Sequence, residues 1–121
     1  MNIKILLIEN NALNTELFQV YLKKYDLKSL KHSESGDLDL KPYKIVIISV
    51  EKISSTINYL DLIIYLKGIR KKNDSVKILA LVTDVDFNLR MAKEIGFDNF
   101  LLKPVSGLAM TQMVDFLISQ T

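Results

Sequence analysis

The segment Tyr43-Lys44-Ile45-Val46-Ile47-Ile48-Ser49-Val50 is the most hydrophobic run of the chain and decides its fold class. Its β-branched residues follow one another without the alternation of a strand that has one face in water. Such a run is typical of a strand buried on both faces, as in a parallel sheet covered by helices. We therefore expect a strand over residues 44–50 at the centre of the sheet.

Outward from this strand, short apolar runs alternate with segments of helical period along the whole chain. This alternation is typical of an α/β fold with a parallel sheet and crossover helices. We expect five strands, at residues 4–8, 28–32, 44–50, 76–82 and 99–102. About five helices should connect and follow them. After the second strand, residues 33–42 offer at most one or two helical turns before Pro42, so the second helix should be shortened or absent.

The first helix, which should end near Lys24, carries more apolar residues than one sheet face needs. The positions Leu13, Leu17, Val20 and Tyr21 follow the helical period, and we expect them to face the sheet. Further apolar residues extend this stripe and indicate either packing on the last helix or, together with the adaptable Met91 of the fourth helix, an interaction surface. These further residues are Phe18, Leu22 and Tyr25.

Helix ends are marked by residues that satisfy free backbone groups. Ser54 or Ser55 can cap the third helix, over about residues 55–71. Asp84 or Asp86 can cap a short helix that ends before Gly96. Ser106 can cap the last helix. The last helix should bury Met110, Val114 and Leu117.

Composition limits the function classes. The 121 residues suit one domain, residues 1–121, with a net charge of +2 that does not indicate nucleic-acid binding. Cysteine is absent from the sequence, which excludes disulfides and thiolate metal sites. His32, the single histidine, is interpreted as a partly exposed strand residue. No signal peptide or membrane span is evident, so a cytoplasmic location is expected.

Ligands of doubly wound sheets bind beyond the carboxyl ends of the strands. The candidate site residues therefore lie at the carboxyl ends of the expected strands or just beyond them: Glu9, Asn10, Ser49, Glu51, Val82, Thr83 and Lys103.

Three segments resemble the receiver domain of two-component response regulators. Ile5-Leu6-Leu7-Ile8-Glu9-Asn10-Asn11 is similar to its first strand, and Tyr43-Lys44-Ile45-Val46-Ile47-Ile48-Ser49 to the strand that delivers its phospho-accepting Asp. The third, Gly96-Phe97-Asp98-Asn99-Phe100-Leu101-Leu102-Lys103-Pro104, is similar to its closing strand with the Lys-Pro pair. The resemblance implies a flavodoxin-like sheet of order 2-1-3-4-5.

The resemblance also implies a degenerate phosphorylation pocket. Ser49 stands at the position of the nucleophilic Asp, and a serine hydroxyl, unlike an ionised carboxylate, needs a general base before it can attack phosphorus. Glu9 keeps one acidic position of the metal site while Asn10 replaces the second. Mg²⁺ prefers several oxygen ligands in octahedral geometry, so we expect metal binding to be lost or weak and no cofactor to be held.

Other positions of the family pattern are altered or ambiguous. The hydroxyl that follows the fourth strand corresponds to Val82 or, with a shift of one residue, to Thr83. Glu51 is either an outward surface residue or a partial replacement for a metal ligand. Phe100 occupies the position of the aromatic switch, although a phenylalanine of the core or its rim is the simpler interpretation.

Lys103 is the unaltered element of the pocket. Because its usual carboxylate partner is replaced, we hypothesise that its amine bonds Glu9 and the Ser49 hydroxyl and so holds the pocket in one state.

Together these features predict a pseudo-receiver in signal transduction that is not an enzyme, but acts as a phosphorylation-independent interaction or dimerisation module with a protein partner or a second copy. Direct binding to nucleic acid or membrane is not expected. Two alternatives stay open: a residual switch that responds to phosphoryl groups or metal, and an N-terminal regulatory domain excised from a larger regulator with a separate output domain.

Overall fold

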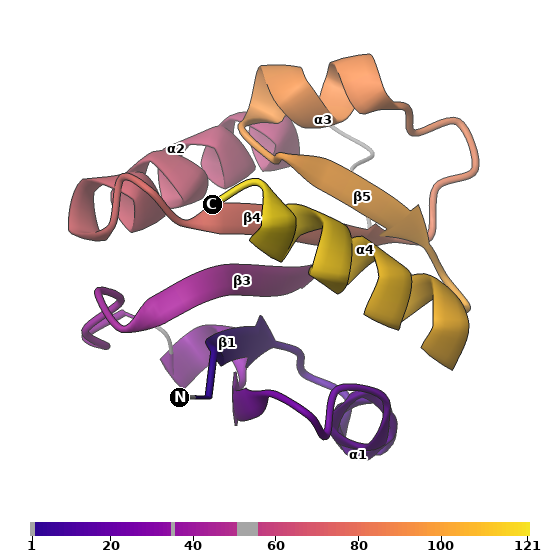
Figure 1. Ribbon diagram of the computed structural model, residues 1–121. Coiled ribbons are helices and arrows are strands. Elements are labelled where there is room, and N and C mark those ends of the chain that lie inside the picture. Colours follow the sequence, from indigo (N-terminus) through magenta and orange to yellow (C-terminus); the bar gives the residue numbers. More distant parts are fainter. Residues whose placement is uncertain (1, 35, 51–55) are drawn as a thin grey trace.

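The computed structural model describes residues 2–34, 36–50 and 56–121, without the side chains of residues 56–58 (Figure 1). Its centre is a sheet of five parallel strands in the order β2-β1-β3-β4-β5, which confirms the expected topology. The strands are β1 (Lys4–Ile8), β2 (Asp26–Leu30), β3 (Tyr43–Val50), β4 (Lys77–Val82) and β5 (Asn99–Leu102).

Four α-helices lie within the described ranges, in agreement with the expectation of about five with the second shortened or absent. They are α1 (Ala12–Tyr21), α2 (Thr56–Lys72), α3 (Leu89–Ile95) and α4 (Gly107–Ser119). As expected, the crossover from β2 to β3 is reduced: its helical part is one 3₁₀ turn, η1 (His32–Glu34).

The helix ends follow local hydrogen-bonding rules. Ser106 caps α4 as expected, because its side chain accepts a bond from the Ala109 N–H. The cap of α3 is Asn88 instead of Asp84 or Asp86, since the helix begins only after Phe87 has entered the core. Gly96 ends α3 with a φ of 123°, a conformation that favours glycine. The expected caps of α2, Ser54 and Ser55, lie outside the described residues.

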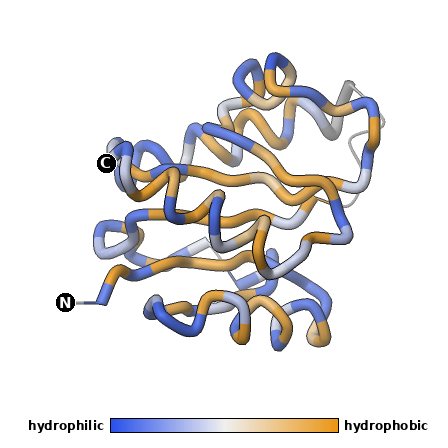
Figure 2. Tube along the Cα trace, turned by 45° about the vertical axis from the view of Figure 1, so that its right-hand side comes forward, coloured by the Kyte–Doolittle hydropathy of each residue, from blue (hydrophilic) through white to orange (hydrophobic). Residues whose placement is uncertain are grey.

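Strand alternation divides the core into two layers. Residues such as Leu6, Val46 and Ile78 face α2 and α3, whereas Leu7, Ile47 and Leu79 face α1 and α4. Figure 2 shows the resulting distribution, with hydrophobic strands in the middle of the molecule and hydrophilic residues along the helices and connections. Both faces of β3 are buried, as its continuous apolar run predicted.

The orientation of α1 differs from the sequence-based expectation. Phe18 and Leu22 are buried in the core, whereas Leu13, Leu17 and Val20 are exposed. The helix is therefore rotated so that the expected interaction residues Phe18 and Leu22 contact the sheet layer. A large aromatic ring explains the preference, because Phe18 fills more of the space between α1, α4 and the sheet than Leu17 would.

Strand β2 begins and ends two residues earlier than expected, and its register explains the shift. Lys4 pairs with Asp26 and Ile8 with Leu30, so the two strands end together. The Glu9 N–H then closes the ladder on the Leu30 carbonyl oxygen at 2.9 Å. His32 consequently lies beyond the strand, in η1, and not within the sheet as interpreted from the sequence.

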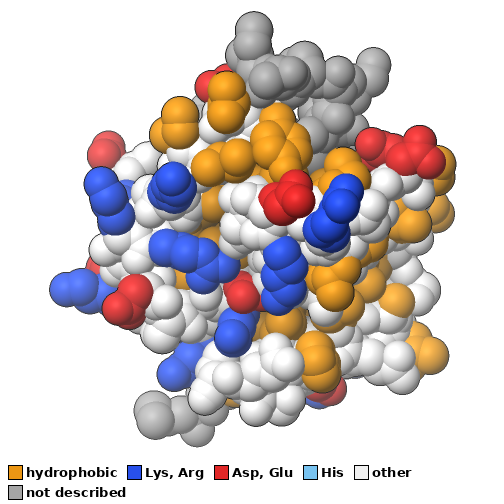
Figure 3. All heavy atoms as spheres, turned by 90° about the horizontal axis from the view of Figure 1, so that it is seen from above, with side chains coloured by type: hydrophobic (Ala, Val, Ile, Leu, Met, Phe, Trp, Pro, Cys, Tyr) orange, Lys and Arg blue, Asp and Glu red, His pale blue; other side chains and the backbone are white. Residues whose placement is uncertain are grey.

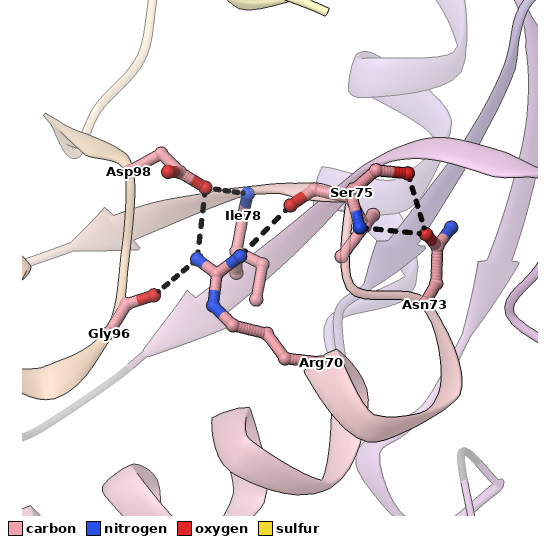
Figure 4. Close-up of polar contacts among 7 residues, drawn as sticks. Arg70, Asn73, Ser75, Ile78, Gly96 and Asp98 are labelled. Atoms are coloured by element: carbon pink, nitrogen blue, oxygen red, sulfur yellow. Dashed lines mark hydrogen bonds and ion pairs between the residues drawn. The ribbon is translucent and has the colours of Figure 1, made fainter.

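At the amino edge of the sheet, Arg70 ties three elements together (Figure 4). Its Nη1 donates to the Val76 carbonyl oxygen at 3.0 Å, and its Nη2 donates to the Gly96 carbonyl oxygen at 2.7 Å and to Asp98 Oδ2 at 3.0 Å. The same Asp98 oxygen accepts the Ile78 N–H at 2.7 Å. The end of α2 is thus fixed to β4 and to the turn between α3 and β5.

The surface has no single charge character on the side seen in Figure 3. Lys and Arg side chains are interspersed there with acidic and hydrophobic ones, in keeping with the net charge of +2. Among the described helices, none combines the length and apolar character needed to cross a membrane.

Candidate functional site

The site lies at the carboxyl edge of the sheet, where β1, β3 and β5 end. Ile8 pairs with Ile48, so the next residues of the two strands, Glu9 and Ser49, follow side by side on the face shared with Leu7 and Ile47. Glu9 and Ser49 are each only 3% exposed, and they are the buried polar residues of the described chain. Sequence and register together therefore place a carboxylate and a hydroxyl at one buried point.

Lys103 brings a cation to the same point from β5. Its backbone N–H donates to the Val82 carbonyl oxygen at 2.8 Å, which fixes the residue at the end of the sheet. Its Nζ donates to Ser49 Oγ. This contact is one half of the arrangement hypothesised for Lys103, with the serine hydroxyl accepting where the family has a carboxylate.

The other half of that hypothesis is wrong. Glu9 Oε2 accepts the Asn11 N–H at 3.3 Å, and no ion pair joins Glu9 to Lys103 in the described part of the chain. The second oxygen, Oε1, is buried and lacks a hydrogen-bond partner among the described residues. The Asn11 N–H thus engages only one of the two Glu9 carboxylate oxygens.

His32 is a site residue that sequence reasoning missed. Its Nε2 lies 3.0 Å from the Ser49 carbonyl oxygen, and its backbone N–H donates to Asn10 Oδ1 at 2.9 Å. Its ring also lies 6.3 Å from that of Tyr65 in α2. The available signal was position: His32 follows β2, and the rule that directs attention to carboxyl strand ends applies to β2 as well.

Within the described residues, these contacts supply fewer oxygen ligands than Mg²⁺ usually takes. The ion prefers octahedral oxygen coordination, usually with more than one carboxylate or with phosphate. Here Glu9 is the single acid among the candidate site residues that the structure describes. The Asn10 amide oxygen accepts a bond from the His32 N–H, and the Lys103 ammonium donates to Ser49 Oγ. No cluster of three or more His, Cys, Asp or Glu residues that could hold a metal is found in the described ranges. Glu51 lies outside them.

The remaining pocket candidates divide between the core and its rim. Val82 is buried in the layer facing α2 and α3, whereas Thr83 is exposed just beyond β4, so Thr83 is the hydroxyl-bearing residue at this strand end. Phe100 is partly buried and packs edge-on against Phe87, with ring centroids 5.1 Å apart. Phe100 therefore contributes to the rim of the core, the simpler of the two interpretations of its position.

The residues expected as an interaction surface mostly serve packing. Phe18 and Leu22 are core residues, as described above, and Met91 packs against the layer of α2 and α3. Tyr25 donates its hydroxyl to Asp115 of α4, and Lys24 Nζ binds the same carboxylate at 2.9 Å. Both hydrogen bonds lower the pKa of the Asp115 carboxyl, and the bond from Tyr25 has the larger effect. Of the two readings left open, packing on the last helix holds for Tyr25.

The reduced second crossover leaves a hollow on the α2 side of β1. A cavity of about 250 Å³ lies there, and its wall is mainly apolar. Lys72 closes one side by donating to the Gly36 carbonyl oxygen at 2.7 Å. The other lining residues are Leu6, Ile8, Leu40, Ile64, Tyr65, Gly68 and Ile69.

Comparisons with known proteins relate this architecture to response regulators. No family model matches the chain, and no curated protein matches it in sequence. Among solved structures, a CheY-like protein (TadZ) of Pseudomonas aeruginosa PAO1 superposes with a TM-score of 0.74 at 13% identity, covering 96% of this chain and 99% of the other.

Two further structures give the same relation. The chemotaxis response regulator CheY4 of Vibrio cholerae has a TM-score of 0.73 at 14% identity over 97% of this chain and 99% of its own. An orphan response regulator of H. pylori has a TM-score of 0.72 at 19% identity over 96% of each chain. At such identities the likeness concerns the fold, and it agrees with the strand order observed here. The chain therefore has the CheY-like receiver fold of response regulators.

Proposed function

We propose that this chain is a pseudo-receiver: a signalling domain that acts through protein interaction without accepting a phosphoryl group. The observation that carries the proposal is the pair formed by Ser49 and Lys103. At the end of β3 the buried Ser49 hydroxyl accepts a hydrogen bond from the Lys103 amine. An un-ionised hydroxyl is a much weaker nucleophile than a carboxylate.

The surroundings of the pair support the same reading. An attacking serine needs a general base, and an ammonium that donates a hydrogen bond to the hydroxyl cannot also remove its proton. The nearby imidazole of His32 is bonded to the Ser49 carbonyl oxygen and not to its hydroxyl. Ser49, Lys103, His32 and Asn10 thus form one hydrogen-bonded cluster at the carboxyl edge of the sheet. A protein partner, and a cytoplasmic place of action, belong to this proposal.

The test is incubation of the protein with acetyl phosphate and Mg²⁺, and separately with beryllofluoride and Mg²⁺. We expect the intact mass to stay unchanged and the backbone amide NMR signals near Glu9, Ser49 and Lys103 to stay in place. A mass increase of one phosphoryl group, or shifts confined to these strand ends, would contradict the proposal.

A matched variant makes the negative result informative. The double substitution Asn10→Asp with Ser49→Asp rebuilds the two missing carboxylates beside Glu9 and Lys103. We expect this variant, unlike the wild type, to show pocket shifts with beryllofluoride and Mg²⁺, since the ion then has several acidic ligands. Equal responses of both proteins would mean that the missing carboxylates do not determine the chemistry.

One observation favours a second candidate, a residual metal-responsive switch. The buried Glu9 Oε1 has no hydrogen-bond partner in the described chain, and burying an unpaired carboxylate oxygen is costly. A bound cation would remove that cost. Titration of the wild type with Mg²⁺ alone, without phosphodonor, separates the candidates: saturable shifts at Glu9 support the switch, and their absence supports the pseudo-receiver.

A further inference from the structure

Helix α1 is apolar on two sides, and only one of them is used by the fold. Phe18 and Leu22 fill the core, while Leu13, Leu17 and Val20 are 73%, 41% and 64% exposed. The spacing of these three residues, four and then three, places them along one stripe of the helix surface. A helix apolar on both sides is normally covered on both.

Charged residues accompany the exposed stripe in a particular order. Glu16 lies within α1, and Lys23 follows in the turn just after the helix, seven residues later. Both are exposed, and neither forms an ion pair in the described part of the chain. The stripe thus has an acidic residue beside its middle and a basic residue just past its end, each available to a partner.

We propose that this stripe is the contact surface of a homodimer, in which α1 packs antiparallel on α1 of a second copy. A two-fold axis between Leu17 and Val20 sets Leu17 of one protomer against Val20 of the other, and does so twice. The same axis brings Glu16 close to Lys23 of the second copy, offset by two residues or about 3 Å along the helix. Both ion pairs form at once.

The charge order identifies a second copy as the occupant. A two-fold interface uses the same patch on both protomers, so the patch must be complementary to itself. The stripe meets this condition when the helices are antiparallel, because each acidic position then meets a basic one. Flanking charges of this kind determine orientation in paired helices. A parallel pair would instead place like charges together.

This inference rests on the proposed function, since it names the partner of the interaction module. Its test uses charge reversal. The variants Glu16→Lys and Lys23→Glu each place two like-charged pairs in the dimer, whereas a mixture of the two variants restores two opposite-charged pairs. In sedimentation equilibrium, we expect wild type to approach twice the monomer mass with rising concentration, each variant alone to remain monomeric, and the equimolar mixture to associate again.

Two results would overturn the proposal: a wild type that stays monomeric throughout, or single variants that associate as the wild type does. Circular dichroism checks that each variant is folded, which is expected because both positions are exposed. Asp61→Lys and Lys67→Glu on α2 are the control reversals and should leave association unchanged. The phosphodonor experiment is independent, so a chain that dimerises but is phosphorylated fails only the proposed function.

Discussion

At the scale of single residues, the pocket shows which contacts can be inferred from strand ends and which cannot. The positions of Glu9, Ser49 and Lys103 follow from the sheet order and the register, because parallel strands end at one edge. The bond from Lys103 to Ser49 follows from this placement. The contacts of Asn10 and His32 depend on where β2 ends, and two residues of register decide whether His32 lies in the strand or reaches Ser49.

The contact between Ser49 and Lys103 predicts unequal costs for removing its two partners. Lys103→Met leaves the buried Ser49 hydroxyl without its donor, whereas Ser49→Ala leaves a half-buried amine that can reach water. We expect Lys103→Met to lower the free energy of unfolding by about 1–2 kcal/mol and Ser49→Ala by less. Urea unfolding of both variants and the double variant measures this. Equal, additive losses would show that the two residues are not coupled.

The hydrogen-bonded carboxylate of Asp115 should make the stability of the protein depend on pH. Its pKa in the folded protein is lowered from 3.8 by the hydrogen bonds of Tyr25 and Lys24, so this carboxylate stabilises the fold above pH 3.8 and the contribution disappears as pH falls through the lowered pKa. We expect wild type to melt at a higher temperature than Asp115→Asn at neutral pH, with the difference vanishing in acid.

Thermal melts of both proteins over a pH series measure this dependence. Because the carboxylate is exposed and screened by solvent, the difference should be small and should shrink in high salt. Asp61→Asn, on α2, makes the same change of charge at another exposed position and serves as the control. A difference that grew toward acid pH would reverse the assigned sign.

At the scale of elements, α1 shows the limit of periodicity. Its apolar residues up to Tyr21 were predicted correctly as helical, but the helix ends there and not near Lys24, so Leu22 and Tyr25 lie beyond it. Two stripes of similar hydrophobicity compete for the sheet, and periodicity alone does not rank them. Packing volume does, because the site between α1 and α4 accepts the ring of Phe18. Helix α4 carried one stripe, and its three expected core residues, Met110, Val114 and Leu117, are indeed buried.

Two glycines in helices should respond in opposite ways when each is replaced by alanine, one gaining and one losing stability. A Cβ at Gly68 in α2 would meet nothing within 4 Å, whereas a Cβ at Gly107, the first residue of α4, would lie 2.9 Å from the ring of Tyr21. We expect Gly68→Ala to stabilise the protein by about 0.8–1 kcal/mol through helix propensity. Gly107→Ala should destabilise it by about 1–3 kcal/mol, because the ring must move.

Chemical denaturation of the two variants tests this pair, and each serves as a control for the other. Adding Tyr21→Leu should relieve the clash and reduce the cost of Gly107→Ala. A stabilising Gly107→Ala in the wild-type background would mean that the Tyr21 ring moves aside freely.

At the scale of the whole molecule, strand order and layer structure were accessible because they depend on many residues at once. The buried runs of β1, β3 and β4 each predict a covered parallel strand, and a wrong boundary in one does not alter the order. What local pattern could not predict is the set of polar links between elements. Arg70 is such a link, because its guanidinium joins α2 to residues 76, 96 and 98.

This link predicts a loss of global stability that leaves the pocket intact. Arg70→Lys keeps the charge but loses the planar guanidinium that reaches all three acceptors. We therefore expect this variant to lose about 1–3 kcal/mol of unfolding free energy, nearly as much as Arg70→Met. Urea unfolding gives these values, with Lys67→Met on the same helix as the control. Amide NMR signals of Glu9, Ser49 and Lys103 should not shift, because the link and the pocket lie at opposite edges of the sheet. If Arg70→Lys were as stable as wild type, the charge and not the forked geometry would hold α2 in place.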